Sequence, residues 1–334
     1  MLATHTAALF RTAVECAAEL LRAGELVALP TETVYGLAAN ALDANAVGKI
    51  FRAKGRPQHN PVIVHVASIE MARRCVAGWP KLADKLAAAF WPGPLTLVLP
   101  RSREIPDAVT AGGGTVGVRW PRHPFIQAVI HECGFPLAAP SANPSNQISP
   151  TTAEHVRAML GEKIRLIVDG GLSSVGIEST VLDVTTKPPR VLRPGMIHAE
   201  SLLAVTGELA HAAGTAASEQ AELRSPGLLR KHYAPQARLK ILGWRDEPDL
   251  NRQLSSLNAQ PIRTHIIAHT QILLGADFPH VSVIPHDAEA FARAIYAELH
   301  RCDDAGAELI VVEALPDGIE WQAVADRLGR AAAE

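Results

Sequence analysis

KGRPQHNPVIVHV, residues 54–66, is the stretch from which the organisation of this chain follows. Two cations, two prolines and two amides precede an apolar run with one histidine, which indicates a loop that enters a buried β-strand over 62–66. In an extended segment residues two apart point the same way, so Lys54 and Arg56 are expected side by side as an anion-binding pair. Taken alone, the stretch favours a simpler interpretation, a solvated basic turn before a strand.

Polar loops at the ends of other predicted strands support the first interpretation. The strand at 25–30 ends in the turn Thr31-Glu32-Thr33, where open α/β sheets place ligand-binding loops, although a hydroxyl-capped turn explains it equally well. SANPSNQIS, residues 141–149, crowds hydroxyl and amide groups between a short strand and a helix that Thr151 or Thr152 caps. GGLSSVGIEST, residues 170–180, has the same character, and its spacing does not fit the G-x-S-x-G turn of serine hydrolases.

Two charged or titratable residues are predicted inside apolar strands. Arg119 follows VGV at 116–118, and a buried cation needs a partner, which the carboxylate of a ligand would provide. His65 lies in the strand at 62–66, where a histidine is more often a core residue than a ligand contact. The glycines at 112–114 are only a weak sign of phosphate binding, because turns require glycine far more often.

Composition indicates a globular protein of two domains. The chain has 334 residues, 48% of them hydrophobic, with 32 basic and 34 acidic residues, so its total charge does not suggest a surface that coats nucleic acid. Four scattered cysteines argue against a zinc ribbon or a disulfide framework and are typical of a reducing compartment. The sequence has no signal peptide and no apolar run of ~20 residues. We therefore expect a cytoplasmic protein without a membrane span.

The predicted fold class is α/β, with a first domain at 1–206. Residues 207–223 are rich in Ala, Gly, Ser and Glu, which indicates a linker or a loosely held helix. The linker and lid region is placed at 207–236, ending with a cluster that contains His232 and Tyr233. At 237–334 strands and helices alternate as in a smaller parallel, Rossmann-like α/β domain.

The motifs exclude several kinds of chemistry. The sequence contains no H-E-x-x-H, no cysteine and histidine pairing signature and no G-x-x-x-x-G-K-[ST]. Cations and hydroxyl groups on loops remain, and these accelerate reactions by positioning and by stabilising charge. Nucleotidyl or phosphoryl transfer fits this set, with Mg²⁺ brought in by the nucleotide rather than held by the protein alone.

A series of motifs in a fixed order then resembles a known family. PTETVYGL, KGRPQHNPVIVHV, FWPGPLTLVL, GVRWPRHP, APSAN, GIESTVLD and RPG resemble the YrdC-type threonylcarbamoyl-AMP synthases, and SPGLLRKHYAP before an α/β domain is similar to the long form of that family. The resemblance covers essentially the whole chain, and it implies that the domain at 1–206 is a catalytic domain built on a twisted open mixed sheet. It implies a nucleotidyltransferase that converts ATP, bicarbonate and L-threonine to threonylcarbamoyl-AMP and pyrophosphate, for threonylcarbamoyladenosine modification of tRNA beside the anticodon. The implied acceptor of the product is the threonylcarbamoyl transferase machinery, with weak RNA binding.

The resemblance also implies the site residues. A basic and polar tetrad around the triphosphate and the carbamate comprises Lys54, Arg56, Ser141 and Asn143. The ATP contacts are Arg56, Asn60, Thr115, Ser141, Ser149 and Arg193, with His232 or Tyr233 as a lid over the nucleotide. The L-threonine contacts are Thr33, His65, Arg119, the backbone of Ala139, and Ser179, with Arg119 paired to the substrate carboxylate.

Two other functions are weighed against this one. An RNA-binding module without catalysis would use the basic residues for phosphate contacts, but the near-zero total charge and the absence of an aromatic stacking motif count against it. A related carbamoyltransferase would be expected in a larger chain with zinc-binding or acylphosphatase-like parts, which four scattered cysteines do not provide.

Overall fold

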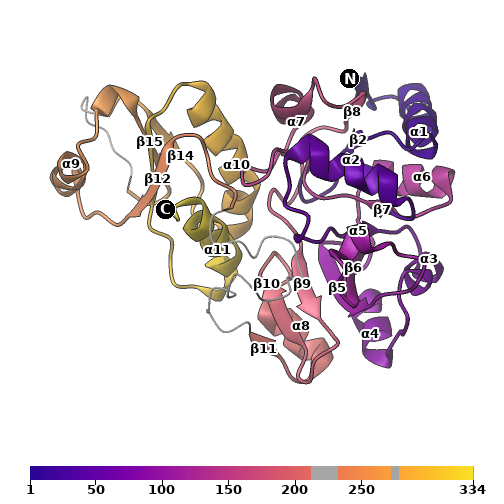
Figure 1. Cartoon of the computed structure of the whole chain (residues 1–334). Coiled ribbons are helices and arrows are strands. Elements are labelled where there is room, and N and C mark those ends of the chain that lie inside the picture. Colours follow the sequence, from indigo (N-terminus) through magenta and orange to yellow (C-terminus); the bar gives the residue numbers. More distant parts are fainter. Residues whose placement is uncertain (212–231, 272–277, 334) are drawn as a thin grey trace. The chain divides into compact units, whose positions relative to one another are not determined.

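The computed structural model describes residues 1–211, 232–271 and 278–333 (Figure 1). The chain divides into two compact units. The first comprises Met1–Ser145 and Ser149–Leu229, and the second comprises Asn146–Ile148 and Arg230–Glu334. Each unit is described by itself below. No helix among the described residues is long and apolar enough to cross a membrane.

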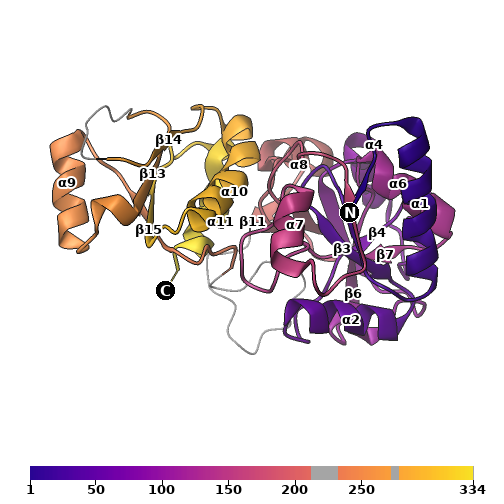
Figure 2. The same cartoon turned by 90° about the horizontal axis from the view of Figure 1, so that it is seen from above.

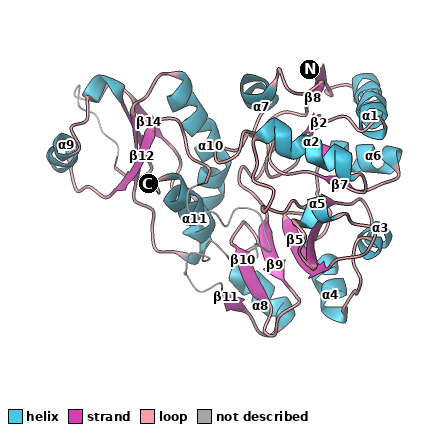
Figure 3. Cartoon of the chain, in the orientation of Figure 1, coloured by secondary structure: helices cyan, strands magenta, loops and turns pink. Residues whose placement is uncertain are grey.

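The first unit is built on one mixed sheet of eleven strands (Figure 3). Their order across the sheet is β1-β8-β2-β3-β7-β4-β6-β5-β9-β10-β11, with both parallel and antiparallel neighbours. The strands are β1 (Leu2–Ala3), β2 (Val27–Leu29), β3 (Gly36–Asn40), β4 (Val64–His65), β5 (Leu95–Pro100), β6 (Thr115–Arg119), β7 (Leu137–Ala138), β8 (Leu166–Asp169), β9 (Thr180–Asp183), β10 (Arg190–Arg193) and β11 (Ala210–His211). The predicted mixed sheet is confirmed.

Side-chain caps begin most of the longer helices of this unit. Thr6, Asp43, Ser68 and Thr152 each accept a hydrogen bond from a backbone N–H of the first turn, so Thr152 rather than Thr151 caps the helix after residue 152. The helices are α1 (Ala7–Arg22), α2 (Ala44–Lys54), α3 (Ile69–Arg74), α4 (Lys81–Phe90), α5 (Asp107–Thr110), α6 (Pro124–Cys133), α7 (Ala153–Leu160) and α8 (Ala199–Thr206).

Two hydrophobic cores lie on opposite faces of the sheet. One core receives residues of α2, α4, α7 and α8 and alternate residues from most strands. The other is formed by α1 and α6, which lie side by side in Figures 1 and 2, against β8, β2, β3 and β7. On β6, Val116 and Val118 belong to the first core, so Thr115, Gly117 and Arg119 point to the opposite face. The polar residues of the central strands therefore share one face.

The second unit contains a smaller sheet of four parallel strands in the order β12-β15-β13-β14. Its strands are β12 (Arg238–Leu242), β13 (Thr264–Ala268), β14 (Val281–Val283) and β15 (Leu309–Glu313), and its helices are α9 (Glu247–Ser256), α10 (Ala288–Asp304) and α11 (Gln322–Ala331), with 3₁₀ turns η1 (Pro261–Arg263) and η2 (Ile319–Trp321). Figure 2 shows α9 on one side of this sheet and α10 and α11 on the other. The predicted small parallel α/β domain is confirmed.

The structure differs from the sequence-based prediction in several element bounds. The strand expected over 62–66 is shorter in the structure, where β4 covers only Val64–His65. Backbone hydrogen bonds continue on both sides of it, from Val62 N to the Val109 carbonyl oxygen and from Val66 N to the Arg119 carbonyl oxygen. Helix α6 and strand β8 were not predicted. The segment 207–223 begins with Gly207, which ends α8, and most of it, from residue 212, lies outside the described residues.

Gly195 fixes how the chain after β10 approaches the start of β9. A Cβ at this position would lie 2.4 Å from the Thr180 amide nitrogen and 2.8 Å from the Ser179 carbonyl carbon. Both are backbone atoms, so they cannot yield as a flexible side chain would. We therefore expect Gly195→Ala to lower the free energy of unfolding by about 1–3 kcal/mol, measured by urea denaturation.

Gly114→Ala is the matched control, because a Cβ there meets no atom within 4 Å. Its unfolding free energy should stay within about 1 kcal/mol of the original value. Equal effects of the two substitutions would contradict the role given to the close approach at Gly195.

Candidate functional site

Lys54 is presented by the end of a helix. It is the last residue of α2, and Gly55 follows with a φ of 60°, the left-handed conformation that ends helices. The prediction that Lys54 and Arg56 lie in one extended segment is therefore wrong. Both side chains are nonetheless buried, with exposed fractions of 3% and 7%.

The Lys54 ammonium group joins α2 to the loop after β7. Its Nζ donates to the Ser141 carbonyl oxygen at 2.5 Å, to the Asn143 side-chain oxygen at 3.2 Å and to the Asn143 carbonyl oxygen. Burial, assisted by the charge of Arg56, holds the pKa of Lys54 well below its usual range, and Glu178 opposes this shift. Three members of the predicted tetrad are thus in direct contact, and the fourth, Arg56, lies within electrostatic range of Lys54.

Arg56 organises the loop that leads to β4. Its Nε donates to the Asn60 carbonyl oxygen at 3.0 Å, and its Nη2 donates to the Asn60 side-chain oxygen and the Pro61 carbonyl oxygen, both at 2.7 Å. Asn60 is fully buried, and its Nδ2 has no hydrogen-bond partner among the described residues. A buried amide donor without a partner is costly, so this group is available to a bound ligand.

Arg119 at the end of β6 has a protein partner that the sequence-based prediction missed. Its Nη2 lies 2.7 Å from Glu32 Oε1, and both side chains are about 95% buried. Its Nη1 donates to Thr33 Oγ1 at 3.0 Å and its Nε donates to the Gly93 carbonyl oxygen at 3.3 Å. Burial acts to raise the pKa of Glu32, but the charge and hydrogen bond of Arg119 outweigh it and lower that pKa. The carboxylate is therefore ionised.

The turn at 31–33 is the hydroxyl-capped turn that the sequence allowed, and it also contacts Arg119. Thr31 Oγ1 accepts from the amides of Thr33 and Val34, as a hydroxyl-capped turn requires, while Thr33 faces Arg119. The Glu32 carbonyl oxygen accepts from Val175 N at 2.7 Å, and the Thr33 carbonyl oxygen accepts from Gly176 N at 3.1 Å. The loop at 170–180 is thereby fastened to this turn.

That loop carries the predicted residue Ser179 toward β10 and β5. Arg193 donates from Nε to the Ser179 carbonyl oxygen and from Nη2 to Ser179 Oγ, both at 3.1 Å. Ser179 Oγ also lies 2.8 Å from Thr96 Oγ1. The preceding residue, Glu178, accepts from Ser149 Oγ at 2.5 Å. Arg193, Ser179 and Ser149 are thus held within one continuous set of contacts.

His65 pairs in register with Arg119 across β4 and β6 and is 3% exposed. Burial, together with the positive charge of Arg119, lowers the pKa of His65 to about 3, despite the opposing charge of Glu32. The imidazole is therefore neutral at pH 7 and can form hydrogen bonds without adding charge to the site.

Four predicted residues stand apart from these contacts. Thr115 begins β6, at the opposite end of that strand from Arg119. The Ala139 amide donates to the Ile63 carbonyl oxygen at 3.1 Å, so only its carbonyl could meet a ligand. His232 and Tyr233 belong to the second unit, where their rings lie 3.9 Å apart by centroid.

The sequence-based prediction missed two acidic residues, Glu32 and Glu178, and the hydroxyl group of Thr96. Glu32 and Glu178 stand inside quoted motifs, PTET and GIEST, so the signal was present. Arginine and lysine side chains predicted to be buried require buried acceptors, and carboxylates in neighbouring loops are the natural ones.

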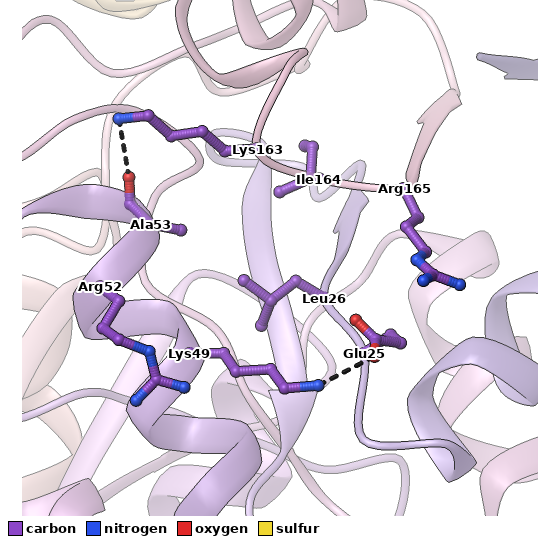
Figure 4. A pocket seen from close by; sticks show the side chains of 8 residues that line it. All are labelled: Glu25, Leu26, Lys49, Arg52, Ala53, Lys163, Ile164 and Arg165. Atoms are coloured by element: carbon purple, nitrogen blue, oxygen red, sulfur yellow. Dashed lines mark hydrogen bonds and ion pairs between the residues drawn. The ribbon is translucent and has the colours of Figure 1, made fainter.

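A separate surface pocket of about 330 Å³ lies elsewhere on the first unit (Figure 4). Leu26 and Ile164 lie among four cationic side chains, with Lys49 paired to Glu25 at 2.9 Å and Lys163 bonded to the Ala53 carbonyl oxygen at 3.3 Å. The pocket contains none of the predicted site residues. Within the described parts of the chain, no cluster of three or more His, Cys, Asp or Glu residues is arranged to hold a metal ion.

Comparison with known proteins places the chain in a family. The family described as "Telomere recombination", which groups Sua5, YciO and YrdC, matches residues 19–195, and the family described as "Threonylcarbamoyl-AMP synthase, C-terminal domain" matches residues 197–333. Threonylcarbamoyl-AMP synthases of Pyrococcus abyssi and Bacillus subtilis are 40% and 42% identical over 323 residues, which is 95% of this chain and 93% and 92% of those proteins. The chain belongs to the threonylcarbamoyl-AMP synthase family.

Solved structures of this family agree in fold. The crystal structure of P. abyssi Sua5 complexed with L-threonine has a TM-score of 0.88 and 39% identity, covering 96% of this chain and 94% of that one. A variant of the same protein has a TM-score of 0.91 and 37% identity, with 99% and 95% covered. The two-domain architecture of threonylcarbamoyl-AMP synthases is therefore that of this chain, and the family performs a reaction of the nucleotidyl-transfer type.

The buried, neutral His65 makes a prediction about acid stability. The unfolded chain takes up a proton near pH 6.5, whereas folded His65 does so only near pH 3. Above pH 6.5 the histidine is neutral in both states. Below pH 6.5 only the unfolded chain takes up the proton, so the free energy of unfolding falls by about 1.4 kcal/mol per pH unit. Between pH 7 and pH 4.5 the free energy of unfolding, measured with urea, should therefore fall by about 2–3 kcal/mol less in His65→Gln than in the original protein.

His131→Gln is the matched control, because His131 is exposed on α6. It should keep the original pH dependence. If His65→Gln shows the same acid destabilisation as the control, His65 is not the neutral buried group described here.

Proposed function

We propose that the chain synthesises threonylcarbamoyl-AMP from ATP, bicarbonate and L-threonine and releases pyrophosphate. The observation that carries this proposal is the convergence of buried cations and hydroxyl groups, described above, in a chain of this family. In the described part of the first unit the buried charged residues are Lys54, Arg56, Arg119 and Arg193 against Glu32, Glu178 and Asp183. An excess of buried positive charge favours anionic ligands.

The threonine end of the site is built around Arg119. A guanidinium binds a carboxylate through two parallel N–H groups, which a lysine cannot do. Thr33, Ser179 and the neutral His65 supply hydrogen-bonding groups near it, and the Ala139 carbonyl adds an acceptor. The relative from P. abyssi, solved in complex with L-threonine, supports this choice of amino acid.

The nucleotide end comprises the Lys54, Arg56, Asn60, Ser141 and Asn143 group. We infer that Lys54 and Arg56 stabilise charge on the transferring phosphate, with Mg²⁺ entering on ATP. The Asn60 Nδ2 donor that lacks a partner would meet the nucleotide. The other proposed ATP contacts are Thr115, Ser149 and Arg193.

The reaction balances with these groups alone. The threonine ammonium releases a proton to water, the neutral amine attacks the carbon of bicarbonate, and water leaves as the carbamate forms. A carbamate oxygen then attacks the α-phosphorus of ATP, and the bond to pyrophosphate breaks. Carbamates decompose in water, so a closed site is useful. His232 or Tyr233 would provide the lid, and the product would serve tRNA modification through a transferase.

The direct test of this proposal is mass spectrometry of mixtures with ATP, bicarbonate and L-threonine. We expect threonylcarbamoyl-AMP only in the complete mixture and none when any one substrate is omitted. Product formed without threonine, or no product at all, would contradict the proposal.

Arg56→Ala should slow pyrophosphate release about 10- to 100-fold. The reason is that one charge-assisted hydrogen bond contributes roughly 1.5–3 kcal/mol, and each 1.4 kcal/mol corresponds to a factor of ten in rate. Arg22→Ala is the matched control, because Arg22 forms an exposed ion pair with Glu132 at 2.9 Å. It should release pyrophosphate at the original rate. An unchanged rate in Arg56→Ala would end the proposed role of this residue.

A further inference from the structure

The Glu32 and Arg119 pair is the most completely buried ion pair in the proposed site. The two side chains are 5% and 4% exposed, and the oxygen to nitrogen distance is 2.7 Å. A buried carboxylate beside an arginine that binds a substrate carboxylate has a cost, because two anions then compete for one cation. The cost of the buried Glu32 carboxylate therefore suggests that it has a role in the site.

The contacts of Arg119 show what Glu32 does for its geometry. A guanidinium has five N–H groups. Thr33 and Gly93 accept from Nη1 and Nε, and Glu32 lies against Nη2. One N–H on each Nη remains beyond the contacts seen within the described residues. Two N–H groups on neighbouring nitrogens can bind a carboxylate in parallel, so Glu32, Thr33 and Gly93 together fix the guanidinium with this pair free.

The charged groups around Arg119 indicate a second role for Glu32. Arg119 contributes one positive charge and Glu32 one negative charge. His65 is neutral, and burial lowers the pKa of His123, which is also within range of Glu32, so that this ring is neutral too. The Arg122 guanidinium is directed to the exposed Pro92 carbonyl oxygen. The charges immediately around Arg119 are therefore balanced before a substrate binds, while the next buried guanidinium, Arg193, is held on Ser179.

We propose that Glu32 is a positioning and specificity-determining residue that makes this end of the site select an amino acid zwitterion over a carboxylic acid that lacks an ammonium group. A balanced site accepts a ligand of zero net charge without leaving an uncompensated buried charge. Without the Glu32 carboxylate the site carries one positive charge and favours a simple anion. The inference rests on the proposed function, since it takes L-threonine as the substrate.

The test compares two ligands by isothermal titration calorimetry. One is L-threonine, and the other is 2,3-dihydroxybutanoate, in which a hydroxyl group replaces the ammonium. The original protein should prefer threonine. Glu32→Gln should shift the ratio of the two affinities by about 10-fold or more toward the hydroxy acid, equivalent to one unit of log K. In turnover it should raise the KM for threonine and leave the KM for ATP within about 2-fold.

Two further variants make the outcome decisive. Glu32→Asp keeps the charge but shortens the side chain, so it should keep the preference for threonine while raising the KM for threonine. Glu132→Gln makes the same chemical change at the exposed Arg22 ion pair and should match the original protein. If Glu32→Gln fails to fold, an unchanged threonine KM in Glu32→Asp overturns the positioning role.

The two proposals fail in different ways. If the original protein binds neither ligand and makes no product, the proposed function is wrong, and this inference falls with it. If the original protein binds threonine and Glu32→Gln keeps the same affinity ratio, only the role of Glu32 is wrong.

Discussion

The arrangement of the first unit depends on the hydrogen bonds that the buried ammonium group of Lys54 requires. Lys54 ends α2 and donates to oxygens of Ser141 and Asn143, which follow a strand more than eighty residues later in the chain. A buried ammonium without acceptors is strongly unfavourable, so the helix end and the loop cannot separate without a large cost. Together with the Ser145 amide, which donates to the Lys54 carbonyl oxygen at 2.8 Å, this group brings the basic motif at 54–56 to the polar loop at 141–149.

The same constraint recurs at each other buried cation of the site. Arg56 is held by the loop at 60–61, Arg119 by Glu32, Thr33 and Gly93, and Arg193 by Ser179. Each contact joins segments far apart in sequence or closes a loop onto itself. The arginines are therefore pre-positioned, and the ordering of these side chains is not left to the moment of substrate binding. Pre-positioned charges of this kind accelerate a reaction by orienting the reactants and by stabilising charge.

Much of this arrangement could be predicted from the sequence, and the missing parts have physical reasons. The apolar run VGV before Arg119 indicated the strand β6, and the choice of Thr151 or Thr152 as a cap indicated the start of α7. The arrangement of Lys54 and Arg56 was wrong because Gly55, taken as part of an extended loop, instead ends a helix. Glu32 and Glu178 were missed because the partner of a buried cation comes from a distant segment, and spacing along the chain does not show that contact. The parallel sheet of the second unit followed from the alternation of strands and helices, whereas the mixed sheet of the first unit was implied by the family resemblance.

The central claim is that the described cations form one site for two ligands. A crystal structure with L-threonine and a non-hydrolysable ATP analogue tests it most directly. The account predicts the threonine carboxylate on Arg119 and the triphosphate against Lys54, Arg56 and Asn60, with the two ligands in contact through the reacting groups. Nucleotide density in the basic pocket beside Lys49 and Arg52, with Lys54 and Arg56 free of ligand, would contradict it.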